Sequence, residues 1–387
     1  MLPGAFWPID TRVSERQPLR FAIVLQTPKD PHSAVYLTYQ TLAAALERLG
    51  HSVEIVCPAD FALSSGRWVP LVYPFAIASW MHRRRRDFDL VMFHSYAGWL
   101  ATALRRAPRS RALVMFHGVE PLYYRELAEE ARAHGRRLSW RYRLLQERLM
   151  PFMLRTACRT AGAVTCFNRA EATAIAAWNW IPSSRVEVLA HGAPPAFFVP
   201  SRDTRPLRTM LFVGQWLPMK GITYLRDAAI TLLQEDPSMR LVCAGTLCSQ
   251  SSVHSDFPLE LRGRVAVRPR VEESALAGLY RDADVFVFPS LYEGFSRALV
   301  EAMAARLAIV TTSVGVAADA LRDEDSALIV PKRRPDAIVA AVRRLHADPG
   351  LAARLGDAAA TAAVSYRLDP VERRTVAVVL QAAESAS

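Results

Sequence analysis

The sequence lacks the cysteine and histidine spacings that mark structural metal sites and disulfide frameworks. Its five cysteines are odd in number and scattered, no C-x-x-C pair occurs, and no histidine cluster has zinc-binding spacing. A zinc-ligated fold and a small secreted disulfide scaffold are therefore excluded as interpretations. The pattern indicates buried thiols in a reducing compartment, at Cys57, Cys158, Cys166, Cys243 and Cys248.

Long apolar runs are also missing. No stretch reaches the roughly 18 uncharged apolar residues that a transmembrane helix needs. Residues 1–19 contain no basic segment followed by an apolar run, so they do not resemble a signal peptide. Low-complexity tracts and repeats shorter than a domain are absent as well. We therefore expect a cytoplasmic protein.

Lysine is scarce, and the formal charge of +11 comes almost wholly from arginine. Such a charge implies attraction to an anionic partner: nucleic acid, an acidic membrane surface or a phosphorylated substrate. Arginine-rich composition is equally typical of a chain encoded by a high-GC genome. Because no RNA-reading motif or aromatic platform is visible, nucleic acid is not expected as a partner.

The chain is long enough for two domains, and its pattern predicts two of the same class. It has 387 residues, 51% of them hydrophobic and 22% charged, as in ordinary globular proteins. Short apolar runs alternate with helical patterns, which is typical of parallel strands covered on both faces. We expect two doubly wound, Rossmann-like α/β domains that face a central cleft. The expected strands are Phe21–Gln26, Val53–Cys57, Asp89–Phe93, Leu113–Phe116, Ala163–Cys166, Val186–Leu189, Thr209–Val213, Arg240–Cys243, Val265–Val267, Asp284–Phe288, Ala308–Thr311 and Ala327–Val330.

The domain boundary is expected in Gly192–Pro206, where prolines accumulate before the next strand. We divide the chain into a flexible tail (1–19), an N-terminal domain (20–195), a linker (196–206) and a C-terminal domain (207–365). Residues 366–387 remain as a C-terminal helix, which has no strand after it and can pack back on the N-terminal domain.

Two stretches of the C-terminal half place polar residues after strands, where ligands bind in open α/β sheets. In LFVGQWLPMKGITYL, Gly214 follows a strand and Lys220 begins a helix, an arrangement suited to a phosphate but also common as a plain turn. In VFVFPSLYEGFSRALVEA, a buried strand leads through Glu293 into a helix that contains Glu301. Eight residues are about two helical turns, so both carboxylates can face one cleft and accept hydrogen bonds from hydroxyl groups.

The second stretch resembles the E-x7-E signature of the retaining glycosyltransferases of the GT-B fold, particularly family four (glycosyl transferases group 1). The similarity extends to FVG…KG at Phe212–Gly221, to CAG at Cys243–Gly245 and, in the first half, to LERLGHSVEIV, FDLVMFH, LVMFHGVE and VEVLAHGAPPAFF. It covers roughly residues 20–365. The resemblance implies a hexosyltransferase-like enzyme that transfers a sugar from a nucleoside-diphosphate sugar with retention of configuration and without a metal or other cofactor.

The resemblance also implies residue roles. Glu301 corresponds to the glutamate that holds the donor's ribose, and Glu293 to the one that meets the donor sugar. Lys220 corresponds to the lysine that neutralises the diphosphate, and His117 to the histidine that reaches toward the transferred sugar. The remaining expected donor contacts are Gly214, Gln215, Gly245, Arg270, Gly294, Phe295 and Ser296.

The chain departs from the family pattern at several positions. Family members carry arginine where this chain has Gln215, so Arg270 or Arg297 would have to supply the second diphosphate cation. TPKDPHSAVY replaces the glycine pair that normally follows the first strand. Two further histidines, His94 and His191, either line the cleft or are ordinary strand-end histidines. The helix start at Asn168 is expected to be a cap.

Two arginine clusters leave the acceptor open. Arg83–Arg86 is a basic run, and Arg132–Arg148 spreads six arginines over an expected helix that also carries Trp140 and Leu144. They are either solvated helix faces or a basic amphipathic surface that contacts an anionic membrane, which would favour a lipid-linked acceptor. Beside glycosyl transfer to a glycan, a lipid-linked or a small-molecule hydroxyl, two alternatives stay open: a sugar phosphorylase or sugar-phosphate synthase, and a non-catalytic binding subunit.

Overall fold

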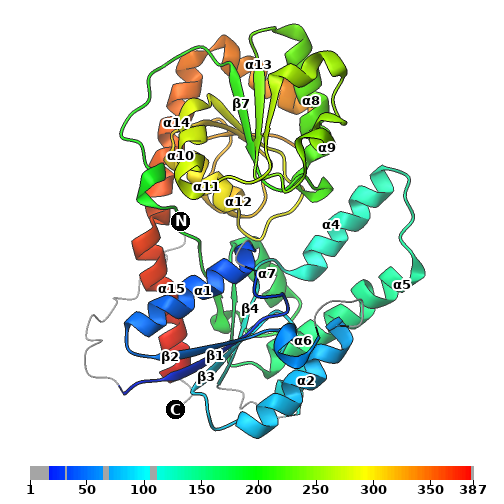
Figure 1. Cartoon of the computed structure of the whole chain (residues 1–387), viewed down its shortest axis with the longest axis vertical. Helices are drawn as coiled ribbons and strands as arrows, with labels where there is room; N and C mark the ends of the chain where they lie inside the picture. Colours follow the sequence, from blue (N-terminus) through cyan, green and yellow to red (C-terminus); the bar gives the residue numbers. More distant parts are fainter. Residues whose placement is uncertain (1–16, 31–32, 64–68, 105–110, 385–387) are drawn as a thin grey trace.

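The computed structural model describes residues 17–30, 33–63, 69–104 and 111–384. They form two α/β domains, one above the other in Figure 1, and the expected two-domain Rossmann-like architecture is confirmed. The expected tail falls mostly outside the described residues.

The N-terminal domain contains a six-stranded parallel sheet in the order β2-β1-β3-β4-β5-β6. Its middle strands are buried on both faces, as their continuous apolar runs predict. The strands are β1 Arg20–Val24, β2 Ser52–Val56, β3 Leu90–His94, β4 Ala112–Met115, β5 Ala163–Cys166 and β6 Val186–Val188. The helices are α1 Ala34–Arg48, η1 Pro58–Phe61, α2 Val69–Arg84, α3 Trp99–Ala103, α4 Glu120–Ala133, α5 Trp140–Arg143, η3 Leu144–Leu149, α6 Met150–Thr160, α7 Arg169–Ala177, η4 Ser183–Arg185 and η5 Pro195–Phe197.

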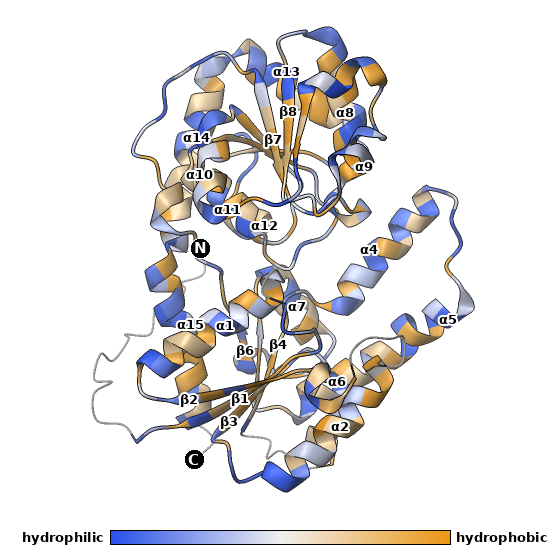
Figure 2. Ribbon diagram, in the orientation of Figure 1, coloured by the Kyte–Doolittle hydropathy of each residue, from blue (hydrophilic) through white to orange (hydrophobic). Residues whose placement is uncertain are grey.

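The C-terminal domain repeats the arrangement in the order β12-β11-β10-β7-β8-β9, again parallel. The strands are β7 Thr209–Val213, β8 Arg240–Ala244, β9 Val265–Arg268, β10 Val285–Phe288, β11 Ala308–Thr311 and β12 Leu328–Ile329. The helices are η6 Pro218–Lys220, α8 Ile222–Glu235, α9 Gln250–His254, η7 Leu259–Arg264, α10 Glu273–Asp282, α11 Arg297–Ala304, α12 Val316–Ala320, α13 Pro335–Ala347, α14 Pro349–Ala363 and η8 Val364–Tyr366. Figure 2 shows hydrophobic strands in both sheets under helices of mixed character, which places the core at the sheet faces.

The last helix, α15 (Leu368–Glu384), returns to the N-terminal domain and lies beside α1 (Figure 1). The chain therefore crosses between the domains twice, and the two crossings touch. Ala193 and Arg367 form a parallel bridge, and a Cβ on Gly192 would lie 2.4 Å from Leu368 Cα. Glycine is required at that point because the two crossing segments approach too closely for a side chain.

The expectation of one helix through Arg132–Arg148 is wrong. α4 ends at Ala133, the chain turns at Gly135 with φ +66, and α5 starts at Trp140. Ser139 caps the new helix, with its Oγ accepting a hydrogen bond from Tyr142 N. Gly135 and Ser139 are the residue types that end and begin helices, and here they outweigh the helical spacing of the arginines. Figure 1 shows the resulting pair of helices projecting from the N-terminal domain.

Candidate active site

Glu293 and Lys220, expected in one donor site, are in direct contact. Lys220 Nζ donates hydrogen bonds to both Glu293 carboxylate oxygens, at 2.7 and 2.9 Å. Ser290 Oγ donates to the same carboxylate at 2.6 Å. Glu293 is only 8% exposed, so the lysine compensates a carboxylate that is largely removed from water.

The contact depends on a close approach between the turn after β7 and the end of β10. Gly221 adopts a left-handed conformation with φ +72, and a Cβ there would lie 1.9 Å from the Pro289 carbonyl oxygen. Leu291 N donates to Met219 O at 2.9 Å across the same junction. Only glycine permits this packing, which sets Lys220 opposite the loop that carries Glu293.

Glu301 lies on α11 with its carboxylate enclosed. Tyr280 Oη donates to Glu301 Oε2 at 2.9 Å, and the second carboxylate oxygen accepts no hydrogen bond from the described residues. Burial raises the pKa of Glu301, while Arg297, one helical turn earlier, opposes the rise. The carboxylate is thus held in one orientation with an acceptor oxygen available to a ligand.

The backbone of Gly294, Phe295 and Ser296 leads into α11. Ser296 has φ +90, uncommon for a residue other than glycine, and its Oγ caps the helix by accepting a hydrogen bond from Leu299 N. Val316 N donates to Phe295 O at 2.9 Å and fixes the loop from the side. A helix N-terminus with free N–H groups, beside a lysine and an arginine, can bind phosphate.

The structure brings some of the other expected donor residues together. Gly214 and Gly245 follow neighbouring strands, and a Cβ on Gly214 would lie 3.9 Å from Lys220 Cδ. Gln215 is exposed beside them. Arg270 is also exposed, after the outermost strand β9, and no contact among the described residues joins it to Lys220. Arg297 is the cation next to Glu301, one helical turn before it on α11.

From the N-terminal domain, His117 faces this site within a cluster of rings. Its ring centroid lies 5.5 Å from His94, 5.8 Å from His191 and 4.9 Å from Phe167. His191 stacks on Phe167 at 4.2 Å and meets Phe295 of the donor loop edge-on at 5.1 Å. Burial lowers the pKa of all three histidines, to about 4 for His94 and about 3 for His191. The imidazoles are therefore neutral at neutral pH.

Two hydrogen-bonded contacts join the domains next to Glu293, and neither was predicted from the sequence. Asn168 caps α7 as expected, but its Nδ2 also donates to Gly294 O at 2.6 Å. Tyr292 Oη donates to Glu171 Oε1 at 2.5 Å and accepts from Val119 N at 2.6 Å. Burial raises the pKa of Glu171 to about 7. The residues flanking Glu293 are therefore held against the N-terminal domain.

A charged contact joins the two domains farther out. Arg333, in the turn after β12, binds Glu126 and Glu130 of α4, and Lys332 Nζ lies 2.8 Å from Glu126 Oε2. Tyr224 Oη also donates to Glu130 at 3.0 Å. The carboxylates of Glu126 and Glu130 are mostly buried, so these pairs hold α4 against the C-terminal domain with little competition from water.

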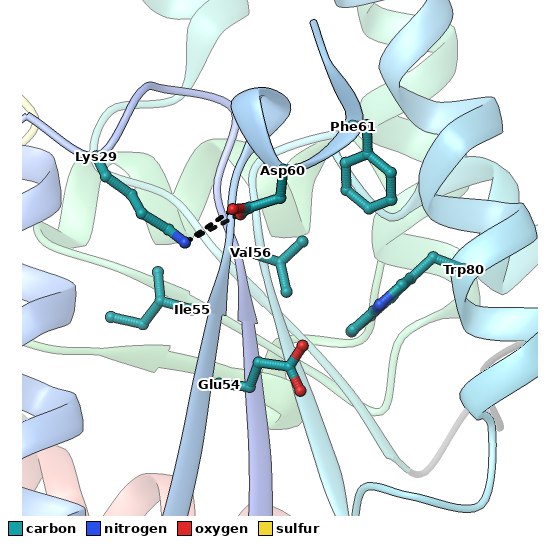
Figure 3. A pocket seen from close by; sticks show the side chains of 7 residues that line it. All are labelled: Lys29, Glu54, Ile55, Val56, Asp60, Phe61 and Trp80. Carbon is teal, nitrogen blue, oxygen red and sulfur yellow. Dashed lines mark hydrogen bonds and ion pairs between the residues drawn. The ribbon is translucent and has the colours of Figure 1, made fainter.

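A cavity of about 350 Å³ lies elsewhere, beside the edge strand β2 of the N-terminal domain. Figure 3 shows the Lys29–Asp60 ion pair at one end, with Phe61 and Trp80 on one side. None of the expected site residues lines it. Its Lys29 comes from the loop where TPKDPHSAVY replaces the family's glycine pair.

Among the described residues, no helix is long and apolar enough to cross a membrane.

Two family models match the chain and together cover both domains. "Glycosyltransferase Family 4" matches residues 38–197, and "Glycosyl transferases group 1" matches residues 200–362. The D-inositol 3-phosphate glycosyltransferase of Streptomyces bingchenggensis is 31% identical over 201 residues, 49% of this chain and 42% of that protein. An uncharacterized glycosyltransferase of Methanocaldococcus jannaschii is 34% identical over 144 residues, 37% of each chain. The matches thus span about half or less of these relatives.

Solved structures share the whole architecture. Sucrose-phosphate synthase from Thermosynechococcus elongatus superposes with a TM-score of 0.72 at 17% identity, over 94% of this chain and 98% of that one. WaaG, a glycosyltransferase involved in lipopolysaccharide biosynthesis, gives 0.70 at 14% identity, over 93% and 99%. HepE of Anabaena, solved in complex with UDP-glucose, gives 0.67 at 16% identity, over 94% and 99%. At such identities the likeness concerns the fold.

Both halves of the chain therefore match the same kind of protein, in the order and with the two facing domains that such proteins have. The chain belongs to the GT-B glycosyltransferases of family 4 type.

Proposed function

We propose that this chain is a retaining glycosyltransferase that moves a sugar from a nucleoside-diphosphate sugar to an acceptor hydroxyl. The observation that carries the proposal is the contact of Lys220 with Glu293 in the loop that leads into α11, the helix that carries Glu301. His117 of the facing domain packs against the same loop at Gly294. Complexes of HepE with UDP and UDP-glucose support a nucleotide-sugar donor on the same fold. The donor binds the C-terminal domain and the acceptor binds the N-terminal domain.

Each group has one task in this scheme. Glu301 accepts hydrogen bonds from the ribose hydroxyls, and Glu293 accepts them from the donor sugar. Lys220, Arg297 and the N–H groups that precede α11 stabilise the negative charge that develops on the departing diphosphate, a contribution that can be the largest in catalysis. When the donor binds, one of the N–H groups of Lys220 Nζ that now bonds Glu293 donates to the diphosphate instead. Since protein cations supply the charge, EDTA is expected to leave turnover unchanged.

The contacts between the domains support a second requirement of the reaction, exclusion of water. The two domains meet at a cluster of packed rings formed by His117, Phe167 and His191 of one domain and Phe295 of the other. A neutral imidazole at His117 can hydrogen-bond a hydroxyl of the transferred sugar without adding positive charge. Closure removes bulk water that would otherwise compete with the acceptor hydroxyl.

The proposal is tested by product stereochemistry and by one substitution. Once a donor that the enzyme uses is known, NMR is expected to show that the product has the same anomeric configuration as that donor. Glu301→Ala is expected to abolish transfer with the melting temperature little changed. Inversion contradicts the retaining assignment, and unchanged turnover in Glu301→Ala contradicts the donor site. Formation of a sugar 1-phosphate from a glycan and phosphate, with no nucleotide sugar present, would instead identify a phosphorylase.

A second proposal concerns where the enzyme works. We propose that it is cytoplasmic and contacts an anionic membrane, which suits a lipid-linked acceptor. Trp140 and Phe152 are 68% and 57% exposed, on helices that also expose arginines such as Arg143 and Arg155. Exposed aromatics beside arginines are typical of proteins that bind the surface of an anionic bilayer.

Vesicle co-sedimentation tests this contact. The wild type is expected to sediment with vesicles containing phosphatidylglycerol and to stay in solution with phosphatidylcholine alone. Trp140→Glu is expected to reduce binding, whereas Leu259→Glu, on an equally exposed apolar residue of the C-terminal domain, is expected to leave it unchanged. Equal binding by both variants contradicts the proposal.

A further inference from the structure

Unpaired polar atoms gather at one place in the N-terminal domain, at the carboxyl edge of its sheet. Tyr39 Oη, His94 Nδ1, His117 Nε2 and Glu120 Oε2 are each enclosed, and none has a hydrogen-bond partner within the part of the chain that the structure describes. Buried polar atoms in folded proteins are nearly always paired, so each such atom needs an explanation. Four of them in one cluster indicate that a hydrogen-bonding group belongs there.

The four side chains come from separate elements that meet at this edge. His94 ends β3, His117 follows β4, Glu120 begins α4 and Tyr39 lies on α1. The Tyr39 ring lies 4.9 Å from His117 and 5.8 Å from His94, and His94 lies 5.5 Å from His117. The Glu120 carboxylate is close enough to contribute to a raised pKa of Tyr39. Figure 1 shows α1 and α4 beginning on the side of this domain that faces the donor domain.

Backbone geometry at the next residue points the same way. Ser95 has φ +54, a conformation that residues other than glycine seldom adopt, and its Oγ donates to Glu120 Oε1. Ser95 N donates a hydrogen bond to Met115 O at 3.0 Å, which fixes the backbone at this residue. The strained serine holds one oxygen of Glu120, which leaves the unpaired Oε2 in a defined position. Strain of this kind is concentrated at functional sites, where it preorganises a side chain.

The charge of the cluster restricts what it can bind. Burial lowers the pKa of both histidines, so each imidazole offers one donor and one acceptor but no positive charge. Glu120 has a pKa raised to about 7 by burial. No lysine or arginine of the described ranges contacts these four side chains. Hydroxyl groups suit such a set of donors and acceptors, whereas a phosphate would meet a carboxyl group without a compensating cation.

We propose that Tyr39, His94, His117 and Glu120 form the acceptor subsite, and that it takes the uncharged, hydroxyl-rich end of the acceptor. This inference rests on the proposed glycosyl transfer and specifies its acceptor class. Two or more acceptor hydroxyls bridge Glu120 Oε2, Tyr39 Oη and His94 Nδ1, and His117 lies at the border of the subsite, where it meets the transferred sugar. A lipid or phosphate attached to the acceptor lies outside this subsite.

The acceptor class is tested with two sets of probes at saturating donor. Neutral p-nitrophenyl hexopyranosides and the corresponding hexose 6-phosphates are compared as acceptors by nucleoside diphosphate release. The neutral glycosides are expected to give a kcat/KM at least about tenfold higher than the hexose 6-phosphates. A factor of that size is the cost of leaving one buried polar group unpaired. A preference for the phosphorylated sugars overturns the inference.

Two conservative variants test the residues. Tyr39→Phe and Glu120→Gln are expected to raise the acceptor KM about three- to tenfold while the donor KM stays unchanged. Tyr73→Phe is the matched control, because Tyr73 is equally buried in the same domain but lies on α2, away from the cluster. Unchanged acceptor KM in both variants overturns the inference and shows that ordinary buried water satisfies these atoms.

The donor controls separate this failure from failure of the proposed function. Two results on the wild type establish glycosyl transfer whatever the variants show. A nucleoside diphosphate raises its melting temperature, and it releases nucleoside diphosphate from the donor only when an acceptor is present. If nucleotide binding is intact but no neutral glycoside is used, only the acceptor inference is overturned. Circular dichroism melts of the two variants, expected to match the wild type, exclude misfolding as the cause of a raised KM.

Discussion

Gly294→Ala is the substitution that the structure predicts to separate the two domains. A Cβ on Gly294 would lie 2.2 Å from the carbonyl oxygen of His117 and 3.0 Å from Gly118 Cα, both on the opposite domain. Non-bonded heavy atoms rest about 3.5 Å apart, so the facing loops must move by roughly 1 Å. These are backbone atoms, which cannot turn aside as a flexible side chain would. The Asn168 Nδ2 bond to Gly294 O spans the same contact and is lost with it.

The expected consequence is loss of transfer without loss of folding. A displacement of about 1 Å between reacting groups can cost on the order of 100-fold in rate, and we expect a fall in kcat/KM of that size. Nucleotide binding is expected to change little, because the N–H of residue 294 is kept and the donor contacts lie within one domain. Steady-state kinetics and nucleotide titration measure the two effects.

Gly263→Ala is the control for this prediction. Gly263 lies in η7 of the same domain, and a Cβ there has no atom within 4 Å. It is expected to behave as the wild type in both assays. A Gly294→Ala enzyme that keeps wild-type kcat/KM would refute the reasoning, since the domains would then work without the close contact.

Three further predictions concern partners of the site. Tyr280→Phe removes the hydroxyl that orients Glu301 and is expected to weaken nucleotide binding about tenfold in calorimetry, and equal affinity argues against that role. Arg333→Ala leaves Glu126 without its arginine and is expected to lower the free energy of unfolding by about 2 kcal/mol and to raise the radius of gyration; an unchanged radius argues against a closing contact. Glu171, with its pKa raised to about 7, keeps a proton in the folded state that the unfolded state loses, so stability falls as pH rises from about 4.5 to 7. In Glu171→Gln, the free energy of unfolding measured with urea is expected to fall less over this pH range, by up to about 3 kcal/mol. Wild-type and variant unfolding free energies that run parallel with pH would contradict this.

The strands could be predicted because continuous apolar runs are a local property of the chain. Each expected strand is present, although β12 is reduced to Leu328–Ile329 and other ends shift by a residue or two. Buried parallel strands have continuous apolar runs. The expectation that two helical turns separate Glu293 from Glu301 was wrong, because Glu293 lies in the loop before α11, which begins at Arg297, and Ser296 has φ +90. The break before Trp140 was not predicted, because the arginines on both sides of it keep helical spacing while the turn depends on a single residue, Gly135.

The partners of the site could not be predicted in the same way. Tyr280 and Glu301 are 21 residues apart, and Tyr292 and Glu171 are 121 apart, so only the folded chain brings them together. Arg270 was the expected donor contact and Arg297 the alternative for the second diphosphate cation. The sequence shows that Arg297 precedes Glu301 by four residues, and the helix makes the two neighbours, but the position of Arg270 depends on the fold of the whole domain.

The central claim is that Lys220, Glu293 and Glu301 form one nucleotide-sugar site. It is tested most directly by a thermal-shift screen of the wild type, Lys220→Ala and Glu301→Ala against nucleoside diphosphates and their common sugars. At about a hundredfold over Kd, one nucleotide is expected to stabilise the wild type by roughly 2–3 kcal/mol, and both variants are expected to lose most of that gain. A wild type that no nucleotide stabilises, or variants stabilised as strongly as the wild type, would contradict the claim.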